Sequence, residues 1–174
     1  MPDGVYGLEV VTPELSLMAG GARSVVLETS EGALTVLDGH MSLVSDVAPC
    51  LVRVEEADGT VLRLAVHSGF LQVDTSPGAA AGLAEGDGPL PGLSTRVTVL
   101  AGVAELAEAI DVPRAELAKE AAAQRVSELS SGRSIVGDGG DGGDGGDAPD
   151  VALAQAEQAL ARAELRLSVA ASPS

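Results

Sequence analysis

An abrupt change of sequence pattern near residue 105 constrains the fold of this chain more than any other feature. Before it, short apolar stretches alternate with turn-forming residues, which is typical of antiparallel strands. After it, two alanine-rich segments carry apolar residues at helical spacing, and a run of glycine and aspartate (137–147) separates them. The sequence therefore predicts a mixed fold: an N-terminal antiparallel β-sandwich or barrel, followed by a C-terminal antiparallel two-helix hairpin.

The composition indicates what the core of such a fold is made of. The chain has 174 residues, enough for one ordinary domain with an appendage. Hydrophobic residues make up 45% of it, but aromatic residues only 1%, namely Tyr6 and Phe70. We therefore expect a core built from valine, leucine and alanine.

The β domain is predicted over residues 1–104. In its clearest hairpin, Arg53 and Arg63 alternate with apolar neighbours, which gives each strand one solvent-exposed face and one buried face. Asp58 and Gly59 lie between these strands and tolerate the positive φ of a tight turn. Residues 75–95, rich in alanine, glycine and proline, are interpreted as a flexible insertion in a hairpin. The expected strands are 7–11, 24–28, 34–37, 51–55, 60–66, 69–73 and 96–101.

The helical hairpin is predicted over residues 105–174. Asp111 is expected to cap the first helix, and Pro113 lies in the first turn, where a missing N–H has no cost. The second helix is expected over residues 150–170. Residues 130–149 are interpreted as a disordered loop, because glycine maximises backbone entropy and like charges repel. The expected apolar faces are Ala115, Ala118, Ala122, Val126 and Leu129 in the first helix, and Leu153, Ala156, Leu160, Ala163 and Leu167 in the second.

Charge and cysteine content narrow the classes of partner and compartment. The net charge is −16, which would repel phosphate backbones and disfavours nucleic acid as a partner. Cys50 is alone, so no internal disulfide forms and a reducing compartment fits. No secretory signal is recognised, and no uncharged run reaches the ~20 residues needed to cross a bilayer. We expect a cytosolic chain, or a peripheral one on a cytosolic membrane assembly, without direct membrane insertion.

Several catalytic chemistries lack their required residues. The one lysine, Lys119, follows Leu117 and Ala118, so a glycine-rich phosphate loop ending in Gly-Lys is excluded. His40 and His67 are far apart in sequence and have no cysteine cluster, which disfavours zinc. No Gly-x-Ser-x-Gly nucleophile elbow occurs. We therefore predict no catalytic residue and no metal site.

Two groups of residues remain as candidates for binding. Arg162 and Arg166 are four residues apart on one helical face, and with Arg114 beside Asp111 they could surround the phosphates of a nucleotide. Ordinary surface charges are the simpler interpretation of the same spacing. The segment 37–44, which contains His40, is either a contact surface or an ordinary loop.

The order and spacing of several segments resemble the epsilon subunit of bacterial F-type, proton-translocating ATP synthases. The segments cover nearly the whole chain outside the two insertions. They are 8–14, 31–32 with 36–40 and 43–45, 65–73, 97–101 with 104–105, 110–111 with 114–115, and 162–170. The resemblance implies a β-sandwich that docks on the gamma subunit and the c-subunit ring in the central stalk.

The resemblance also implies a function. Such a subunit couples proton-driven rotor rotation to ATP synthesis and is not catalytic by itself. Its mobile hairpin would restrain ATP hydrolysis by transient contact with the alpha/beta catalytic head. The chain would then be a regulatory subunit, held peripherally at the cytoplasmic face of the cell membrane.

Site residues follow from the resemblance by position. No cofactor is required, and ATP is the expected regulatory ligand. Ala121 stands where nucleotide-binding members tend to have arginine, which predicts weaker ATP affinity. The implied ATP contacts are Glu105, Ile110, Asp111, Arg114, Ala115, Arg162 and Arg166. The implied partner contacts are Glu31, Gly39, His40, Met41 and Leu43.

Two rival functions predict different observations. A free-standing ATP-sensing module outside any rotary complex would not copurify with a gamma subunit from native membranes, whereas a stalk subunit would. An enzyme would show turnover as an isolated chain, but the absence of the catalytic motifs described above argues against this rival.

Overall fold

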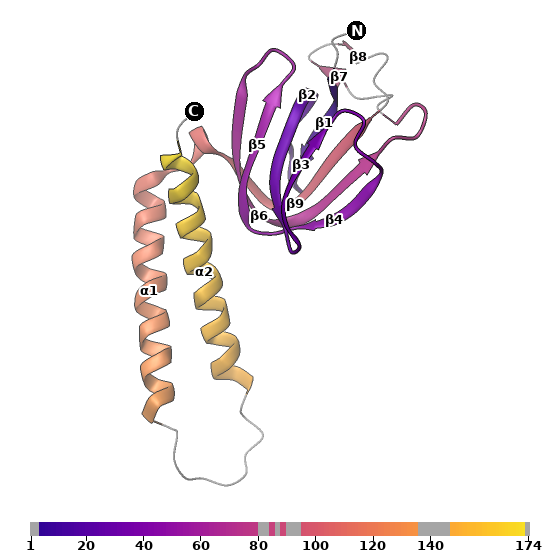
Figure 1. Ribbon diagram of the computed structural model, residues 1–174. Coiled ribbons are helices and arrows are strands. Elements are labelled where there is room, and N and C mark those ends of the chain that lie inside the picture. Colours follow the sequence, from indigo (N-terminus) through magenta and orange to yellow (C-terminus); the bar gives the residue numbers. More distant parts are fainter. Residues whose placement is uncertain (1–3, 80–83, 86–87, 90–94, 136–146, 173–174) are drawn as a thin grey trace. The chain divides into compact units, whose positions relative to one another are not determined.

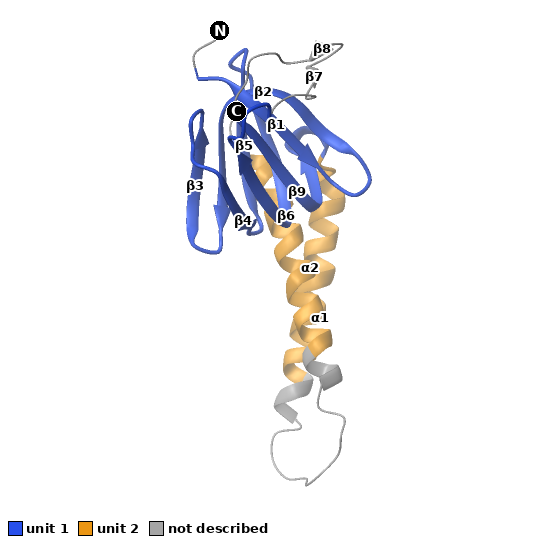
Figure 2. Cartoon of the chain, turned by 90° about the vertical axis from the view of Figure 1, so that its right-hand side faces the viewer, with its two compact units in different colours: residues 1–109, 172–174 blue, residues 110–171 orange. Residues whose placement is uncertain are grey.

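The computed structural model shows a strand-rich unit followed by a helical one (Figure 1). The two units are residues 1–109 with 172–174, and residues 110–171 (Figure 2). The structure describes residues 4–79, 84–85, 88–89, 95–135 and 147–172. The predicted fold class, a β-sandwich followed by two helices, is confirmed.

The β unit is a sheet that closes on itself. The strand order is β1-β9-β6-β5-β2, and β1 pairs with β2 as well as with β9. β3 extends the sheet beside β2, and β4 pairs with β6. The strands are β1 (Tyr6–Val11), β2 (Ser16–Thr29), β3 (Gly32–Leu37), β4 (Leu43–Val47), β5 (Cys50–Glu56), β6 (Val61–Asp74), β7 (Ala84–Glu85), β8 (Gly88–Pro89) and β9 (Arg96–Leu106).

Alternation along the strands buries one face of the sheet in an aliphatic core. Leu8, Leu64 and Leu71 are fully buried, and most of the other core residues are valines. Tyr6 is also fully buried, and its hydroxyl donates a hydrogen bond to the Val36 carbonyl at 3.0 Å. This bond joins β1 to β3, and it gives the buried phenol the acceptor that it needs.

Three features of the sheet differ from the sequence prediction. β4 was not predicted, because a short edge strand with Ser45 and Asp46 lacks a regular apolar alternation. β6 was predicted as two strands, but it is continuous and its register against β9 shifts on either side of Ser68. The pairing of β1 with β9 is parallel within an otherwise antiparallel sheet, which the strand pattern did not indicate.

The boundary between the two units lies later than the sequence indicated. β9 continues to Leu106 because its pairing with β6 runs from Asp74 back to Leu64, and a 3₁₀ helix (Ala107–Ala109) follows it. Glu105, expected in the helical part, therefore lies on β9. The predicted flexible insertion 75–95 falls largely outside the described residues; within it, β7 pairs with β8.

The helical unit consists of two antiparallel helices, α1 (Val112–Ile135) and α2 (Asp147–Ala171) (Figure 1). The carboxylate of Asp111 accepts a hydrogen bond from the Arg114 amide at 3.0 Å, so the predicted N-cap forms. Both helices are longer than predicted: α1 continues through Gly132 to Ile135, and α2 begins at Asp147 with Pro149 in its first turn, where proline is tolerated. The rest of the predicted disordered loop, residues 136–146, lies outside the described residues.

The helices meet along a narrow line of alanines. Ala115 and Ala122 on α1, and Ala156 and Ala163 on α2, are buried and follow a seven-residue spacing. Ala118, predicted on the same face, is exposed, because so narrow a seam does not reach it. Beside the seam, Lys119 Nζ lies 3.3 Å from Glu164 Oε1.

Candidate functional site

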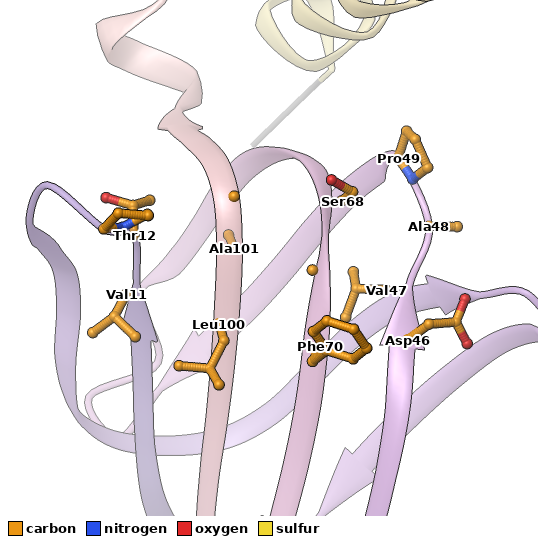
Figure 3. A pocket seen from close by; sticks show the side chains of 13 residues that line it. Val11, Thr12, Asp46, Val47, Ala48, Pro49, Ser68, Phe70, Leu100 and Ala101 are labelled. Carbon is orange, nitrogen blue, oxygen red and sulfur yellow. The ribbon is translucent and has the colours of Figure 1, made fainter.

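An apolar hollow of about 860 Å³ lies on the outer face of the β unit. Its floor is a row of side chains on neighbouring strands: Asp46 on β4 is opposite Phe70 on β6, and Leu100 on β9 is opposite Phe70 and beside Val11 on β1. Figure 3 shows these four side chains in that order across the sheet. Phe70 is 60% exposed and Leu100 47% exposed, an unusual placement for large apolar side chains in one row.

The hollow exists because backbone replaces side chains beside that row. At Gly69, where β6 changes register, a Cβ would lie 2.2 Å from the Leu100 carbonyl oxygen. Gly102 is the neighbouring residue on β9 that also lines the hollow. Gly69 therefore lets β6 and β9 approach closely, and the absence of side chains at both glycines leaves open space beside the row.

The rim of the hollow is rigid and carries one ionised group. Pro13 and Pro49 line opposite sides, and the turn at Thr12 is fixed by a hydrogen bond from its hydroxyl to the Leu15 carbonyl at 3.1 Å. Asp46 is the one acidic residue in the lining. Hydrogen bonds from Ser30 lower the pKa of the Asp46 carboxyl, so it is charged at neutral pH.

This arrangement suits binding rather than catalysis. The lining holds no pair of groups placed to transfer a proton or to attack a substrate. Within the part of the chain that the structure describes, no three His, Cys, Asp or Glu side chains gather in a way that could hold a metal ion. A broad apolar surface on a rigid sheet is instead the chemistry of a protein–protein interface.

Comparisons with known proteins agree with this interpretation. The family model described as the ATP synthase delta/epsilon chain β-sandwich domain matches residues 6–77. The chain is 38% identical to the ATP synthase epsilon chain of Thermobifida fusca over 117 residues, which are 66% of this chain and 72% of the relative. It is 34% identical to the epsilon chain of Desulforapulum autotrophicum over 169 residues, 97% of each chain. The chain belongs to the ATP synthase epsilon family.

These relatives confirm both the family and the class of function that the sequence predicted. The chain is a non-catalytic subunit of ATP synthase. A chain in the solved mitochondrial ATP synthase of Euglena gracilis has the same fold, with a TM-score of 0.60 at 19% identity, over 91% of this chain and 76% of that one.

The residues implied as partner contacts in the epsilon family lie in two separate connections. Glu31 is exposed at the tip of the β2–β3 hairpin. Gly39, His40 and Met41 lie in the β3–β4 connection, where Gly39 has φ +77° and Met41 is 75% exposed. His40 Nδ1 lies 2.8 Å from the Met41 carbonyl oxygen. Leu43 is the first residue of β4 and is partly buried against the core. It therefore anchors the end of the connection and is not part of the exposed surface of the connection.

The residues implied as ATP contacts are divided between the two units. Glu105 lies in the β unit, and the other six lie in the helical unit. Asp111 and Arg114 at the start of α1 are exposed, and the Asp111 carboxylate is already used as the helix cap. Arg166 is half-buried and Arg162 exposed on α2.

Antiparallel packing places the start of α1 and the end of α2 at the same end of the hairpin (Figure 1). Ile110 and Ala115 are both buried there. The helical unit therefore gathers the cationic candidates Arg114 and Arg166 near one end. Ala121, at the position that predicts weaker affinity, is exposed.

Sequence reasoning missed the hollow itself. Phe70 and Leu100 were placed on strands, but their direction relative to the core was not predicted. The available signal was Phe70 on the face of the strand that also carries Ser68 and Gln72, because a large apolar side chain opposite the core-facing Leu71 and Val73 indicates contact with a partner.

Proposed function

We propose that this chain docks on the rotor of ATP synthase through the apolar hollow of its β unit and transmits rotation without chemistry of its own. The gamma subunit covers the row Val11, Leu100 and Phe70. The c-subunit ring contacts the turn at Glu31 and the connection that carries Met41. The observation that supports this assignment most directly is the row of exposed large apolar side chains on a closed sheet.

Closure of the sheet supports a mechanical role. Each of the strands β1, β9, β6, β5 and β2 is held by hydrogen bonds on both sides, so a force applied at the hollow is resisted by the whole ring. The core behind it is fully buried and aliphatic, and such cores are densely packed and resist compression. A rigid wedge of this kind is suited to coupling rotor rotation with ATP synthesis.

The hairpin is proposed as a regulatory element with ATP as its ligand. It forms a separate compact unit, and most of the buried residues of that unit are alanines. A ligand that binds one pose of such a unit better than another shifts the population toward that pose. ATP bound near Arg114 and Arg166 would hold the hairpin away from the alpha/beta catalytic head and relieve its restraint of ATP hydrolysis.

The place of action is proposed to be the cytoplasmic face of the cell membrane, by attachment to the rotor. In the described part of the chain, no helix has the length and apolarity that a membrane span requires. Attachment to the complex through the hollow accounts for a peripheral location.

The docking proposal is tested with ATP synthase from the source organism, stripped of this chain. Phe70→Ala should weaken rebinding of the full chain by more than about tenfold, because truncating a central aromatic anchor typically costs about 2 kcal/mol or more. Val61→Ala is the control, since Val61 is 43% exposed on the same strand but does not line the hollow. Equal affinities for the two variants would contradict docking through the hollow.

The regulatory proposal is tested by titrating ATP into the full chain while following the amide resonances of Arg114 and Arg166. Binding should shift both resonances, and Arg166→Ala should abolish the shift at Arg114. The absence of any shift up to millimolar ATP would remove the sensing role and leave the docking role intact.

A further inference from the structure

A hydrogen-bonded bridge joins the edge of the hollow to the β2–β3 hairpin. The Asp46 carboxylate accepts two hydrogen bonds from Ser30, one from the hydroxyl at 2.8 Å and one from the backbone amide at 3.1 Å. The Ser45 hydroxyl donates to the same carboxylate at 3.5 Å. Asp46 lines the hollow, whereas Ser30 does not.

The hairpin tip held by this bridge has a defined shape. The Thr29 hydroxyl donates to the Gly32 carbonyl at 3.0 Å and accepts from the Glu31 amide at 3.2 Å. Gly32 has φ +127°, a conformation that favours glycine. These bonds satisfy the backbone of the tip and leave the Glu31 side chain exposed to solvent.

Backbone and side-chain hydrogen bonds together attach β4 to the β2–β3 hairpin. The Ala48 amide donates to the Glu28 carbonyl at 2.9 Å, so the end of β4 is tied to β2 just before the tip. Two residues further along the chain, just after β2 ends, the carboxylate of Asp46 accepts the hydrogen bonds from Ser30. Because Asp46 is also opposite Phe70 in the β4–β6 register, one residue bonds to the hairpin tip and lies next to the apolar row.

We propose that Asp46 is a positioning residue that fixes the Glu31-bearing tip relative to the apolar hollow, so that both meet the rotor as one rigid surface. This inference rests on the proposed docking function. Without the bridge, the tip is free to move, and the rotor must order it on binding. That ordering lowers affinity without changing any contact in the hollow.

The test compares three variants of the full chain: Asp46→Asn, Ser30→Ala and the double variant. Asparagine keeps the shape of aspartate, but it has no negative charge, so any bonds that it makes with Ser30 are weaker than those of the carboxylate. Asp58→Asn is the control, because it removes one negative charge from the β5–β6 turn, which carries none of the proposed contacts and where Asp58 is exposed. Thermal unfolding followed by Tyr6 fluorescence establishes that each variant folds.

The first measurement is the ¹⁵N order parameter of the Glu31 amide in the unbound chain. It should fall from about 0.85 to below about 0.6 in the Asp46 and Ser30 variants and stay unchanged in the control. The second is affinity for ATP synthase stripped of this chain, which should fall roughly three- to tenfold in each single variant. The double variant should bind as well as the single variant that has the lower affinity, because each single substitution removes the same bridge.

The outcomes separate this inference from the docking proposal. A mobile tip with unchanged affinity, or additive losses in the double variant, would overturn the positioning role of Asp46. If Phe70→Ala weakens binding in the same experiment, docking through the hollow stands even then. If Ser30→Ala, which alters no residue of the hollow, reproduces the loss seen with Asp46→Asn, a direct contact of Asp46 with the rotor is excluded as the cause.

Discussion

Gly69 offers the sharpest test of how this sheet is built. A methyl group there would lie 2.2 Å from the Leu100 carbonyl oxygen and 3.0 Å from the Ala101 Cα, both on the paired strand β9. Ordinary contact begins near 3.4 Å, so Gly69→Ala must push β6 and β9 apart by roughly 1 Å. Both atoms belong to backbone, so no side-chain rotation relieves the clash.

The expected magnitude combines three terms. Overpacking of this kind typically costs about 1–3 kcal/mol, and a weakened hydrogen bond between the strands adds about 1 kcal/mol. Replacing glycine restricts the unfolded chain and returns about 0.4–1 kcal/mol. We therefore expect Gly69→Ala to lower the free energy of unfolding of the β unit by about 2 kcal/mol.

The assay is urea unfolding followed by the fluorescence of Tyr6. This tyrosine is the only one in the chain and is fully buried in the β unit, so its signal reports on that unit and not on the hairpin. With an m-value of about 2 kcal/mol/M, typical of small proteins, the midpoint should fall by about 1 M.

Gly102→Ala is the matched control. Gly102 lines the same hollow, but its Cβ would meet nothing closer than the Ser68 hydroxyl at 3.7 Å, and its φ is not positive. It should change the unfolding free energy by less than about 0.5 kcal/mol. Equal midpoints for the two variants would refute the explanation of the hollow as a backbone contact between β6 and β9.

Further predictions concern ionisable groups. Burial raises the pKa of the Tyr6 hydroxyl, so the stability that the buried phenol contributes is present below the unfolded-state pKa of about 10 and is lost as the pH rises above it. Urea midpoints measured above about pH 10 should therefore fall in the wild type and fall less in Tyr6→Phe. The Ser30 hydrogen bonds lower the pKa of the Asp46 carboxyl, so the stability that the carboxylate contributes is present above the unfolded-state pKa of about 3.9 and is lost as the pH falls through the folded-state pKa. In Asp46→Asn, the urea midpoint should therefore depend less on pH in the acid range. Burial raises the pKa of the Cys50 thiol, so Ellman's reagent should label it only as fast as the β unit opens, and rapid labelling of the folded chain would contradict this. Lys119→Met should cost the hairpin less than about 1 kcal/mol by helical circular dichroism, since the pair with Glu164 is exposed.

Local sequence determined the secondary elements that depend on neighbours in the chain. The cap at Asp111 forms because its carboxylate reaches an amide three residues away. The alanines of the hairpin seam follow from periodicity along each helix. The aliphatic core follows from a composition with few aromatic side chains to bury. The cap depends on one turn of chain, the alanine faces on spacing within each helix, and the kind of core on composition, so the sequence alone predicts all three.

The hollow could be decided only by the tertiary structure. In β6, Leu71 and Val73 lie on one face, and Phe70 lies on the other with Ser68 and Gln72, so the pattern along this strand does not show what Phe70 lies beside. Pairing with β9 and β4 places the leucine and the valine inside and leaves Phe70 outside, beside Leu100. A shift of one residue in that register would exchange the two faces. Register is set by contacts between segments far apart in the sequence, which no local pattern contains, and for this reason the docking surface and its bridge to the Glu31 hairpin came from the fold alone.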